Sequence, residues 1–448
     1  MAQMKMSRPS ARKRRGAPKR WLPGVAAIGA VLAAAALTAS CSAGGDPAAD
    51  PAATAASSPS ALPSATGPAA ALPSADPTPP DPPAQPSTVA HWGSFFGARR
   101  GNFDVSVSPV TVTLPDTVAE VGSSNSTQYA LLTNGTVYAW GMGNNGQLGD
   151  GSTANSFTTP VQVRFPAGVR IAWIPTDVMP FNTGLAVDVT GRVWGWGKNG
   201  GGELCLGNNT QYTTPVQLPL APVTALAGAS NHALYDAHGT VYACGQNVEG
   251  DLGDGSTRNS MTPVRVAGLD GQEVTKLTAS FANSGALLSD GAYFDWGYNA
   301  AGQLGDGQAG RPSDVPVRVR VPRAVRQVAL GGSIWNNGQT LVKLSNGSIW
   351  AWGSDRSCQL GDLRIGLRRS PVQVHAPTGV TYKVLATGSA TSYAISTAGK
   401  VYAWGVSHVG QVGNGRTSTI CRPVAVAAGA QFISATANNV VVSLSQSH

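Results

Sequence analysis

The sequence predicts an all-β fold, a seven-bladed β-propeller, and three observations lead to that prediction. The chain of 448 residues contains 55 Gly and 31 Pro, and only 12% of its residues are charged. Surface helices need Glu and Lys on their wet face, so this composition favours many short strands joined by turns. A Trp-Gly motif also returns at nearly regular spacing, and the two ends of the repeated region complement each other as strands.

Residues 1–40 are expected to be a signal peptide. Residues 1–20 hold eight basic residues and no acidic residue, and an apolar stretch from Trp21 to Ala39 follows them. A basic region, an apolar region and small residues beyond it are typical of a secretory signal. A membrane anchor that is never cleaved is the alternative, because about 20 apolar residues suffice for one span.

Residues 41–87 are expected to form a disordered stalk. Cys41 follows Leu37, Thr38, Ala39 and Ser40, a run that resembles a bacterial lipoprotein signal in which the Cys is lipidated. The residues after it are Ala, Pro, Ser, Asp and Thr almost throughout, and such a segment cannot bury a core. The sequence therefore predicts export, either to the cell surface through a lipid on Cys41 or into the medium by plain secretion.

The formal net charge of +8 belongs to the leader. Beyond residue 20 the chain has 23 basic and 23 acidic residues. A nucleic-acid binder keeps a basic excess in its folded part. We therefore expect no nucleic-acid partner, and contact with a membrane only through a lipid anchor or the signal segment.

Residues 88–448 divide into units of about 52 residues, and a period of that length indicates a repeat architecture. Each unit reads as four strands, one opened by Pro-Val and another preceded by a tight turn such as Asn134-Gly135. Four-stranded units at this period form a β-propeller. Seven anchor residues mark the units: Trp92, Trp140, Trp196, Cys244, Trp296, Trp352 and Trp404.

The ends of the repeated region indicate how the ring closes. The segment from Val442 to Ser445 aligns with Val342 to Ser345, so the last unit lacks its anchor strand. Residues 88–93 fit the missing strand without a gap. We expect this N-terminal strand to join the C-terminal strands, because closing the ring removes exposed strand edges.

The run from Trp296 to Gly305, with its Pro-Val and Gly-Thr-Val-Tyr-Ala-Trp-Gly companions, resembles the regulator-of-chromosome-condensation repeat family. The resemblance recurs at most anchors of residues 88–448 and implies a seven-bladed propeller that binds other proteins. The name-giving member is a nuclear exchange factor for a small GTPase, and a secreted bacterial relative inhibits β-lactamases. The leader and stalk of this chain match the secreted bacterial lipoprotein setting.

The sequence predicts no catalytic residue, cofactor or metal. Gly141 to Gly146 matches the Gly-x-Gly-x-x-Gly pattern, but it lies between strands instead of opening a helix. The six His residues lack metal-ligand spacing, and the four Glu residues lie in separate units. We expect a monomer that binds an unknown protein without catalysis. A secreted enzyme inhibitor or enzyme and an exchange factor like the name-giving member are the alternatives.

Two long units suggest where a partner docks, because propeller loops carry function and Trp and Arg often anchor interfaces. One unit contains Trp173 and the other contains Trp335. The alternative is that both Trp residues cover local apolar surface and that His232 is a packing residue. The candidate protein-binding residues are Trp335, Phe281, Trp173, Arg323, Arg326 and His232.

Four Cys residues lie beyond Cys41, namely Cys205, Cys244, Cys358 and Cys421. Outside the cell they allow two disulfides in any of three pairings. Cys358 and Cys421 fall in loops of neighbouring units and are a candidate pair. Cys244 takes an anchor position, where it could instead be an apolar filler.

Overall fold

The computed structural model describes residues 86–94, 105–332, 338–436 and 438–444. The chain divides into two units, residues 1–78 and 79–448, and every described residue belongs to the second. The expected signal peptide, Cys41 and the stalk up to residue 85 therefore lie outside the described residues, as does Trp335.

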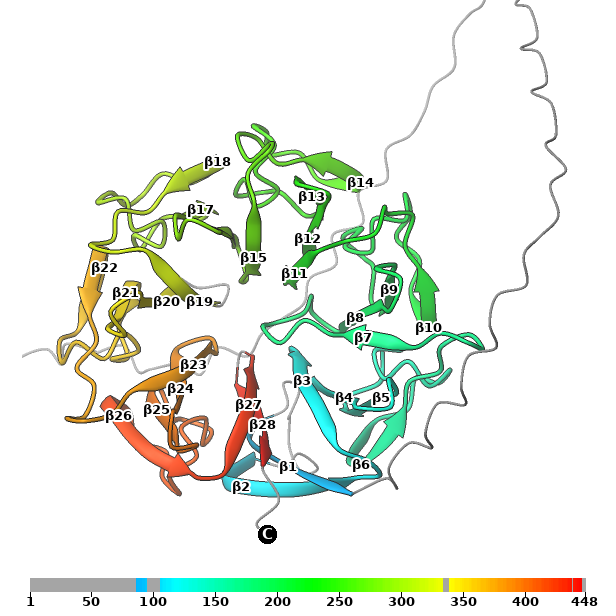
Figure 1. Ribbon diagram of the computed structural model, residues 1–448, viewed down its shortest axis with the longest axis horizontal. Helices are drawn as coiled ribbons and strands as arrows, with labels where there is room; N and C mark the ends of the chain where they lie inside the picture. Colours follow the sequence, from blue (N-terminus) through cyan, green and yellow to red (C-terminus); the bar gives the residue numbers. More distant parts are fainter. Residues whose placement is uncertain (1–85, 95–104, 333–337, 437, 445–448) are drawn as a thin grey trace, which may run out of the picture. The chain divides into compact units, whose positions relative to one another are not determined.

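Every regular element of the described residues is a β-strand, and the strands form seven antiparallel sheets of four, which follow one another around a ring (Figure 1). Blade 1 contains β3 (Val118–Ser124), β4 (Thr127–Leu132), β5 (Val137–Gly141) and β6 (Ser156–Gln162). Blade 2 contains β7 (Ile171–Trp173), β8 (Thr183–Asp188), β9 (Val193–Gly197) and β10 (Tyr212–Gln217). Blade 3 contains β11 (Ala225–Ala229), β12 (His232–Ala237), β13 (Thr240–Gly245) and β14 (Ser260–Arg265).

The remaining four blades repeat this order from an inner strand outward. Blade 4 contains β15 (Val274–Ala279), β16 (Asn283–Leu288), β17 (Tyr293–Gly297) and β18 (Ser313–Arg318). Blade 5 contains β19 (Val325–Gly331), β20 (Gln339–Leu344), β21 (Ile349–Asp355) and β22 (Gly366–Gln373). Blade 6 contains β23 (Tyr382–Thr387), β24 (Thr391–Ser396), β25 (Val401–Gly405) and β26 (Ile420–Ala427). Blade 7 contains β27 (Ala430–Ala435), β28 (Asn439–Leu444), β1 (Ser87–Ser94) and β2 (Val105–Leu114).

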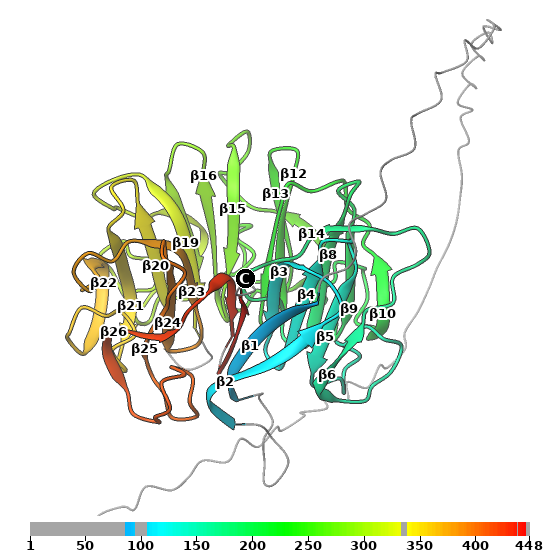
Figure 2. The same cartoon turned by 60° about the horizontal axis from the view of Figure 1, so that its bottom comes forward.

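Blade 7 confirms the predicted all-β propeller and its closure by residues 88–93. β1 lies between β2 and β28, and its pairs with β28 include Val89 with Ser443 and Trp92 with Val440. Figure 2 shows β1 and β2, in blue and cyan, beside the red C-terminal strands at the front of the ring. The N-terminal strand therefore occupies a central position in its sheet, where it pairs with β2 on one edge and with β28 on the other.

The core lies between the blades. Second strands such as β4 are buried along their whole length, because each of their faces packs on a neighbouring blade, whereas outer strands such as β6 stay partly exposed. Apart from Trp140, each buried anchor Trp donates a hydrogen bond to the preceding blade, as when Trp196 Nε1 donates to the Gln147 carbonyl at 2.9 Å. The same contact recurs from Trp92, Trp296, Trp352 and Trp404 to Gln411, Asp251, Gln303 and Gln359.

Tight turns join the second and third strands, as the Asn-Gly pairs predict. Gly135 has φ of +83°, a backbone conformation that Gly adopts without a Cβ penalty. Asn134 Oδ1 accepts a hydrogen bond from the Thr136 amide at 2.9 Å. The local residues alone therefore specify this hairpin.

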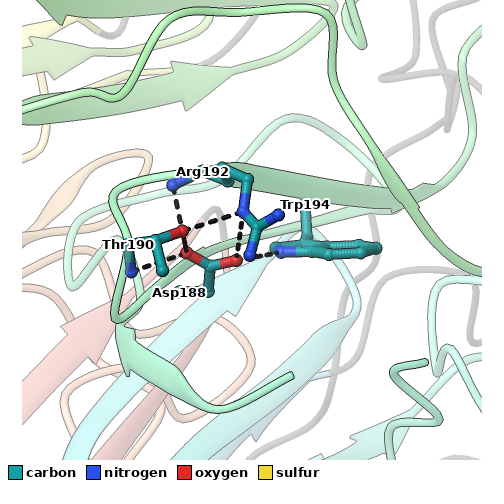
Figure 3. A network of polar contacts seen from close by, with 4 residues as sticks. All are labelled: Asp188, Thr190, Arg192 and Trp194. Carbon is teal, nitrogen blue, oxygen red and sulfur yellow. Dashed lines mark hydrogen bonds and ion pairs between the residues drawn. The ribbon is translucent and has the colours of Figure 1, made fainter. Parts of the chain in front are cut away.

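The corresponding hairpin of blade 2 is fastened by Asp188, which ends β8 (Figure 3). Its carboxylate accepts hydrogen bonds from the Thr190 amide at 2.8 Å and from Trp194 Nε1 at 3.0 Å, and it pairs with Arg192 Nε at 3.1 Å. Burial by itself raises the pKa of Asp188, but the hydrogen bonds from Thr190, Trp194 and Arg192 outweigh burial and lower that pKa to about 2. The carboxylate is thus ionised at neutral pH and holds the turn and the indole together.

Candidate protein-interaction surface

The inner strand of blade 2 leaves its sheet after three residues. β7 ends at Trp173, and the chain runs into the centre of the ring and returns before β8 begins at Thr183 (Figure 1). Residues 174–182 are called the crossing segment below. Val178 forms a parallel bridge with Ser123 of blade 1, and the Phe181 amide donates to the Ser230 carbonyl of blade 3 at 2.6 Å. The segment thereby links the inner strands on both sides of its own blade.

A glycine in blade 1 makes room for the crossing segment. A Cβ on Gly122 would lie 2.7 Å from the Pro175 carbonyl oxygen and 2.8 Å from Met179 Cε. Real Cβ atoms do not approach that closely, so the path of the segment depends on the missing side chain. Met179 is fully buried as a result.

Charged groups fasten the crossing segment to the other inner strands. Lys276 Nζ of β15 lies 2.9 Å from Asp177 Oδ2 and donates to the Val328 carbonyl at 3.0 Å. Glu120 of β3 accepts a hydrogen bond from the Ile174 amide at 2.8 Å. Burial raises the pKa of Glu120, while that hydrogen bond opposes the rise. Blades 1, 2, 4 and 5 are therefore tied together at the centre of the ring.

A cavity of about 500 Å³ opens beside the crossing segment, on the face where the inner strands begin. We call this side the entry face, and it also carries the hairpins between second and third strands. The wall of this cavity consists of the half-buried Trp173 ring, other apolar side chains, Thr hydroxyls and the Lys276–Asp177 ion pair. The lining residues are Glu120, Trp173, Ile174, Pro175, Thr176, Asp177, Thr224, Ala225, Leu226, Thr275, Lys276 and Leu277.

A smaller cavity of about 120 Å³ adjoins the first, since both are lined by Thr176, Asp177 and Lys276. Its remaining wall comes from blades 5, 6 and 7 and consists of Gln327, Val384, Leu385, Phe432 and Ile433. Together the two cavities form a depression of mixed polar and apolar lining around one central ion pair. Such a surface can accept an extended or looped segment of another molecule.

The aromatic candidates occupy opposite faces of the ring. Trp173 lines the cavity on the entry face. Phe281 follows the other end of β15, is half-buried, and contacts Phe181 with ring centroids 5.7 Å apart. Trp173 and Phe281 therefore cannot contribute to one compact contact, although both lie near the ring's centre.

The remaining candidate protein-binding residues differ in how exposed they are to solvent. Arg323 and Arg326 are exposed on the entry face, where β18 connects to β19. His232 is only 1% exposed, and its Nε2 lies 3.1 Å from Ser284 Oγ. Burial lowers the pKa of His232 to about 4, so the ring is neutral and packed between blades 3 and 4. His232 thus has no surface to offer a partner.

Both pairs of cysteines form disulfides that join neighbouring blades. Cys358 of the loop after β21 bonds to Cys421 of β26. Cys205 of the loop after β9 bonds to Cys244 of β13, so Cys244 is not a free apolar filler. Sequence reasoning left the second pair open, although both of its members depart from the repeat in adjacent units.

Sequence reasoning also missed Glu120, Asp177 and Lys276, which share no motif. Within the described ranges, no group of three or more His, Cys, Asp or Glu side chains is arranged to hold a metal ion. The same residues include no helix long and apolar enough to cross a membrane.

Comparison with known proteins supports this architecture. The family model for the regulator of chromosome condensation (RCC1) repeat matches residues 134–176, 190–235, 238–286 and 290–334. The ultraviolet-B receptor UVR8 of Arabidopsis thaliana is 28% identical over 287 residues, which are 63% of this chain and 63% of UVR8. The human E3 ubiquitin-protein ligase HERC2 is 29% identical over 314 residues, which are 67% of this chain and 6% of HERC2. The chain thus spans less than two thirds of either relative.

Solved structures share the fold. Human WBSCR16 superposes with a TM-score of 0.69 at 18% identity and covers 80% of this chain and 99% of its own. Prp20p of Saccharomyces cerevisiae superposes with a TM-score of 0.69 at 21% identity and covers 81% of this chain and 92% of its own. Its structure is described together with its binding properties to Gsp1p and histones. The repeat matches, the seven four-stranded blades and these folds agree: the chain carries RCC1 repeats within a seven-bladed β-propeller.

Proposed function

We propose that this chain is a non-catalytic, protein-binding propeller that is displayed outside the cell. The observation that carries the binding function is the cavity on the entry face, where the half-buried Trp173 and a central ion pair line a depression of about 500 Å³. Concave sites with apolar walls and a few fixed polar groups are where ligand segments bind. A partner that inserts a loop would bury Trp173, the kind of residue that dominates interface energies.

The relatives support protein binding as the general role. Prp20p has the same fold and is described with its binding to Gsp1p and histones. UVR8 and HERC2 match this chain in sequence and are described as an ultraviolet-B receptor and an E3 ubiquitin-protein ligase, so similar sequences occur in proteins with different described roles.

The disulfides support display outside the cell. Two inter-blade disulfides would persist in an oxidising compartment and are rare in the reducing cytosol. The basic and apolar leader and the position of Cys41 after small residues favour export with a lipid anchor. An exchange factor for an intracellular GTPase would not meet its substrate there.

Site-specific photo-crosslinking on intact cells tests the binding surface. A crosslinking residue at Thr275, which is exposed in the cavity wall, should give a discrete adduct that disappears with Trp173→Ala. A crosslinking residue at Val248, which is 68% exposed in a loop on the opposite face, serves as the control. Equal adducts from both positions, or none from Thr275, would contradict binding at the cavity.

The expected lipid anchor is tested at Cys41. Cys41→Ser should move the propeller from the cell envelope into the medium, because the residue that would carry the lipid anchor is lost. Fractionation with mass spectrometry of the N-terminal peptide measures this. Retention of the variant in the envelope would contradict lipidation, and retention in the cytoplasm would contradict export.

A further inference from the structure

A second depression on the entry face concentrates positive charge. The groove has a volume of about 650 Å³ and lies where β18 leaves blade 4 and the chain enters blade 5. Arg318, Arg320 and Arg323 line it, and Arg326 is exposed just beyond it. Within the described residues, none of these four side chains forms an ion pair or a side-chain hydrogen bond. The complete lining is Asp290, Gly291, Ala292, Tyr293, Arg318, Val319, Arg320, Val321, Arg323 and Ala324.

The repeat supplies an internal comparison for this groove. Blade 1 has a groove of about 560 Å³ at the corresponding place, between the hairpin at Gly135 and the end of β6. Its lining contains one arginine, Arg164, and one acid, Asp150. A groove of this shape therefore occurs in both blades. The cluster of three arginines occurs only in the groove beside blade 4 and not in that of blade 1. The fold does not require the extra arginines.

The backbone arranges the arginines for shared recognition. Arg318 and Arg320 alternate around the buried Val319, so their side chains leave the chain on the same side. The one acid in the groove, Asp290, already accepts a hydrogen bond from the Ala292 amide at 2.7 Å. Unpaired guanidinium groups repel one another, and carboxylates relieve that repulsion through two parallel hydrogen bonds.

We propose that this arginine groove, Arg318, Arg320 and Arg323, binds an extended acidic segment of a protein partner. The inference rests on the proposed protein-binding function and names the chemistry of one contact. A protein segment fits better than nucleic acid, because the chain beyond residue 20 carries equal numbers of basic and acidic residues. An extended peptide with carboxylates on alternate residues would place successive acids on one side, facing the arginines.

Fluorescence anisotropy with the purified full chain tests this. The probe is a labelled peptide of alternating Asp and Ser, and its Asn-for-Asp counterpart shows the dependence on charge. The Asp peptide should bind, more weakly at high ionic strength. The variant Arg320→Glu with Arg323→Glu should raise its Kd by about tenfold or more. The matched variant Arg164→Glu with Arg170→Glu changes the total charge equally and should alter Kd by less than about twofold.

The other outcomes separate the alternatives. Equal losses in both double variants would overturn the groove as a site and leave only long-range attraction. Tighter binding of a single-stranded oligonucleotide or of anionic lipid vesicles, lost with Arg320→Glu and Arg323→Glu, would overturn the assignment to protein.

The chain's own acidic residues Asp46, Asp50, Asp76 and Asp81 are a possible competitor for the peptide. Peptide binding seen only after their change to Asn would assign the groove to that segment. Failure here leaves the Thr275 crosslinking result unaffected.

Discussion

Asp355 shows how one atom changes a repeated contact. In blade 3 the corresponding residue, Asn247, accepts from the Leu252 amide at 2.8 Å and donates to Asp254 Oδ1 at 3.2 Å. Asp355 keeps the first bond, to the Leu360 amide at 2.9 Å, but it meets the Asp362 carboxylate without an amide hydrogen. Burial, and then the proximity of Asp362, raise the pKa of Asp355 to about 8. We therefore expect Asp355 to keep a proton at neutral pH, at the place where Asn247 has its amide donor.

Stability should therefore depend on pH through Asp355. The folded protein keeps a proton that the unfolded chain releases above its ordinary pKa of 3.8, so stability falls as pH rises from there to about 8. Asp355→Asn should remove this fall and raise the free energy of unfolding at about pH 9 by about 1–3 kcal/mol. Urea unfolding at several pH values measures it.

Asp290→Asn, a change of an exposed hairpin carboxylate, is the control for Asp355→Asn. It removes one negative charge without touching the Asp355 and Asp362 pair. An unchanged pH dependence in Asp355→Asn would contradict the retained proton.

At the scale of the element, neighbouring blades are joined in two chemically different ways. In most places a loop glycine lies flat on the next anchor Trp, and a Cβ on Gly149 would meet Trp196 Nε1 at 2.8 Å. In blade 2 the equivalent of Gly149 is Cys205, and the anchor that it meets is Cys244. A disulfide has replaced the glycine and tryptophan contact as a matched pair.

Restoring the usual pair should compensate for the lost disulfide. Cys205→Gly alone should cost about 2–4 kcal/mol, because the cross-link and its filling volume are lost. Cys244→Trp alone should also destabilise, because its indole would meet the Cys205 side chain. The double variant should recover most of the loss, and a reductant should then destabilise it only through the remaining Cys358–Cys421 disulfide. Additive losses in a double-mutant cycle would refute the exchange.

At the scale of the whole molecule, stability depends on a closed ring. β1 pairs on both edges, and its Trp92 also donates to the Gln411 carbonyl of blade 6 at 2.9 Å. Blades 6 and 7 therefore both depend on contacts made by β1. Without β1, blade 7 would expose two unpaired edges.

A chain that begins at residue 95 should lose more than about 4 kcal/mol against one that begins at residue 79. Guanidinium unfolding and near-ultraviolet circular dichroism measure this. A peptide of residues 86–94 added in trans should restore part of the loss, which separates a missing strand from general misfolding. Equal stability of the two shortened chains would contradict closure by β1.

The strand class, the number of blades and the strand that closes the ring could all be predicted from the order of the amino acids. These features depend on local patterns, since alternating strands, Asn-Gly turns and Trp anchors recur at a constant period. It also marked the unit around Trp173 as unusual. The local pattern predicts nothing further about this unit, because the length of an insertion does not reveal its path.

The route of the crossing segment, and the distant groups that it contacts, depend on how the blades are arranged in three dimensions. Asp177 and Lys276 are 99 residues apart and pair only because the crossing segment runs into the centre of the ring. The pairing of Cys205 with Cys244 and the separation of Trp173 from Phe281 likewise follow from how blades stack and which face each loop reaches. Contacts of this kind depend on three-dimensional distance, which a one-dimensional period cannot encode.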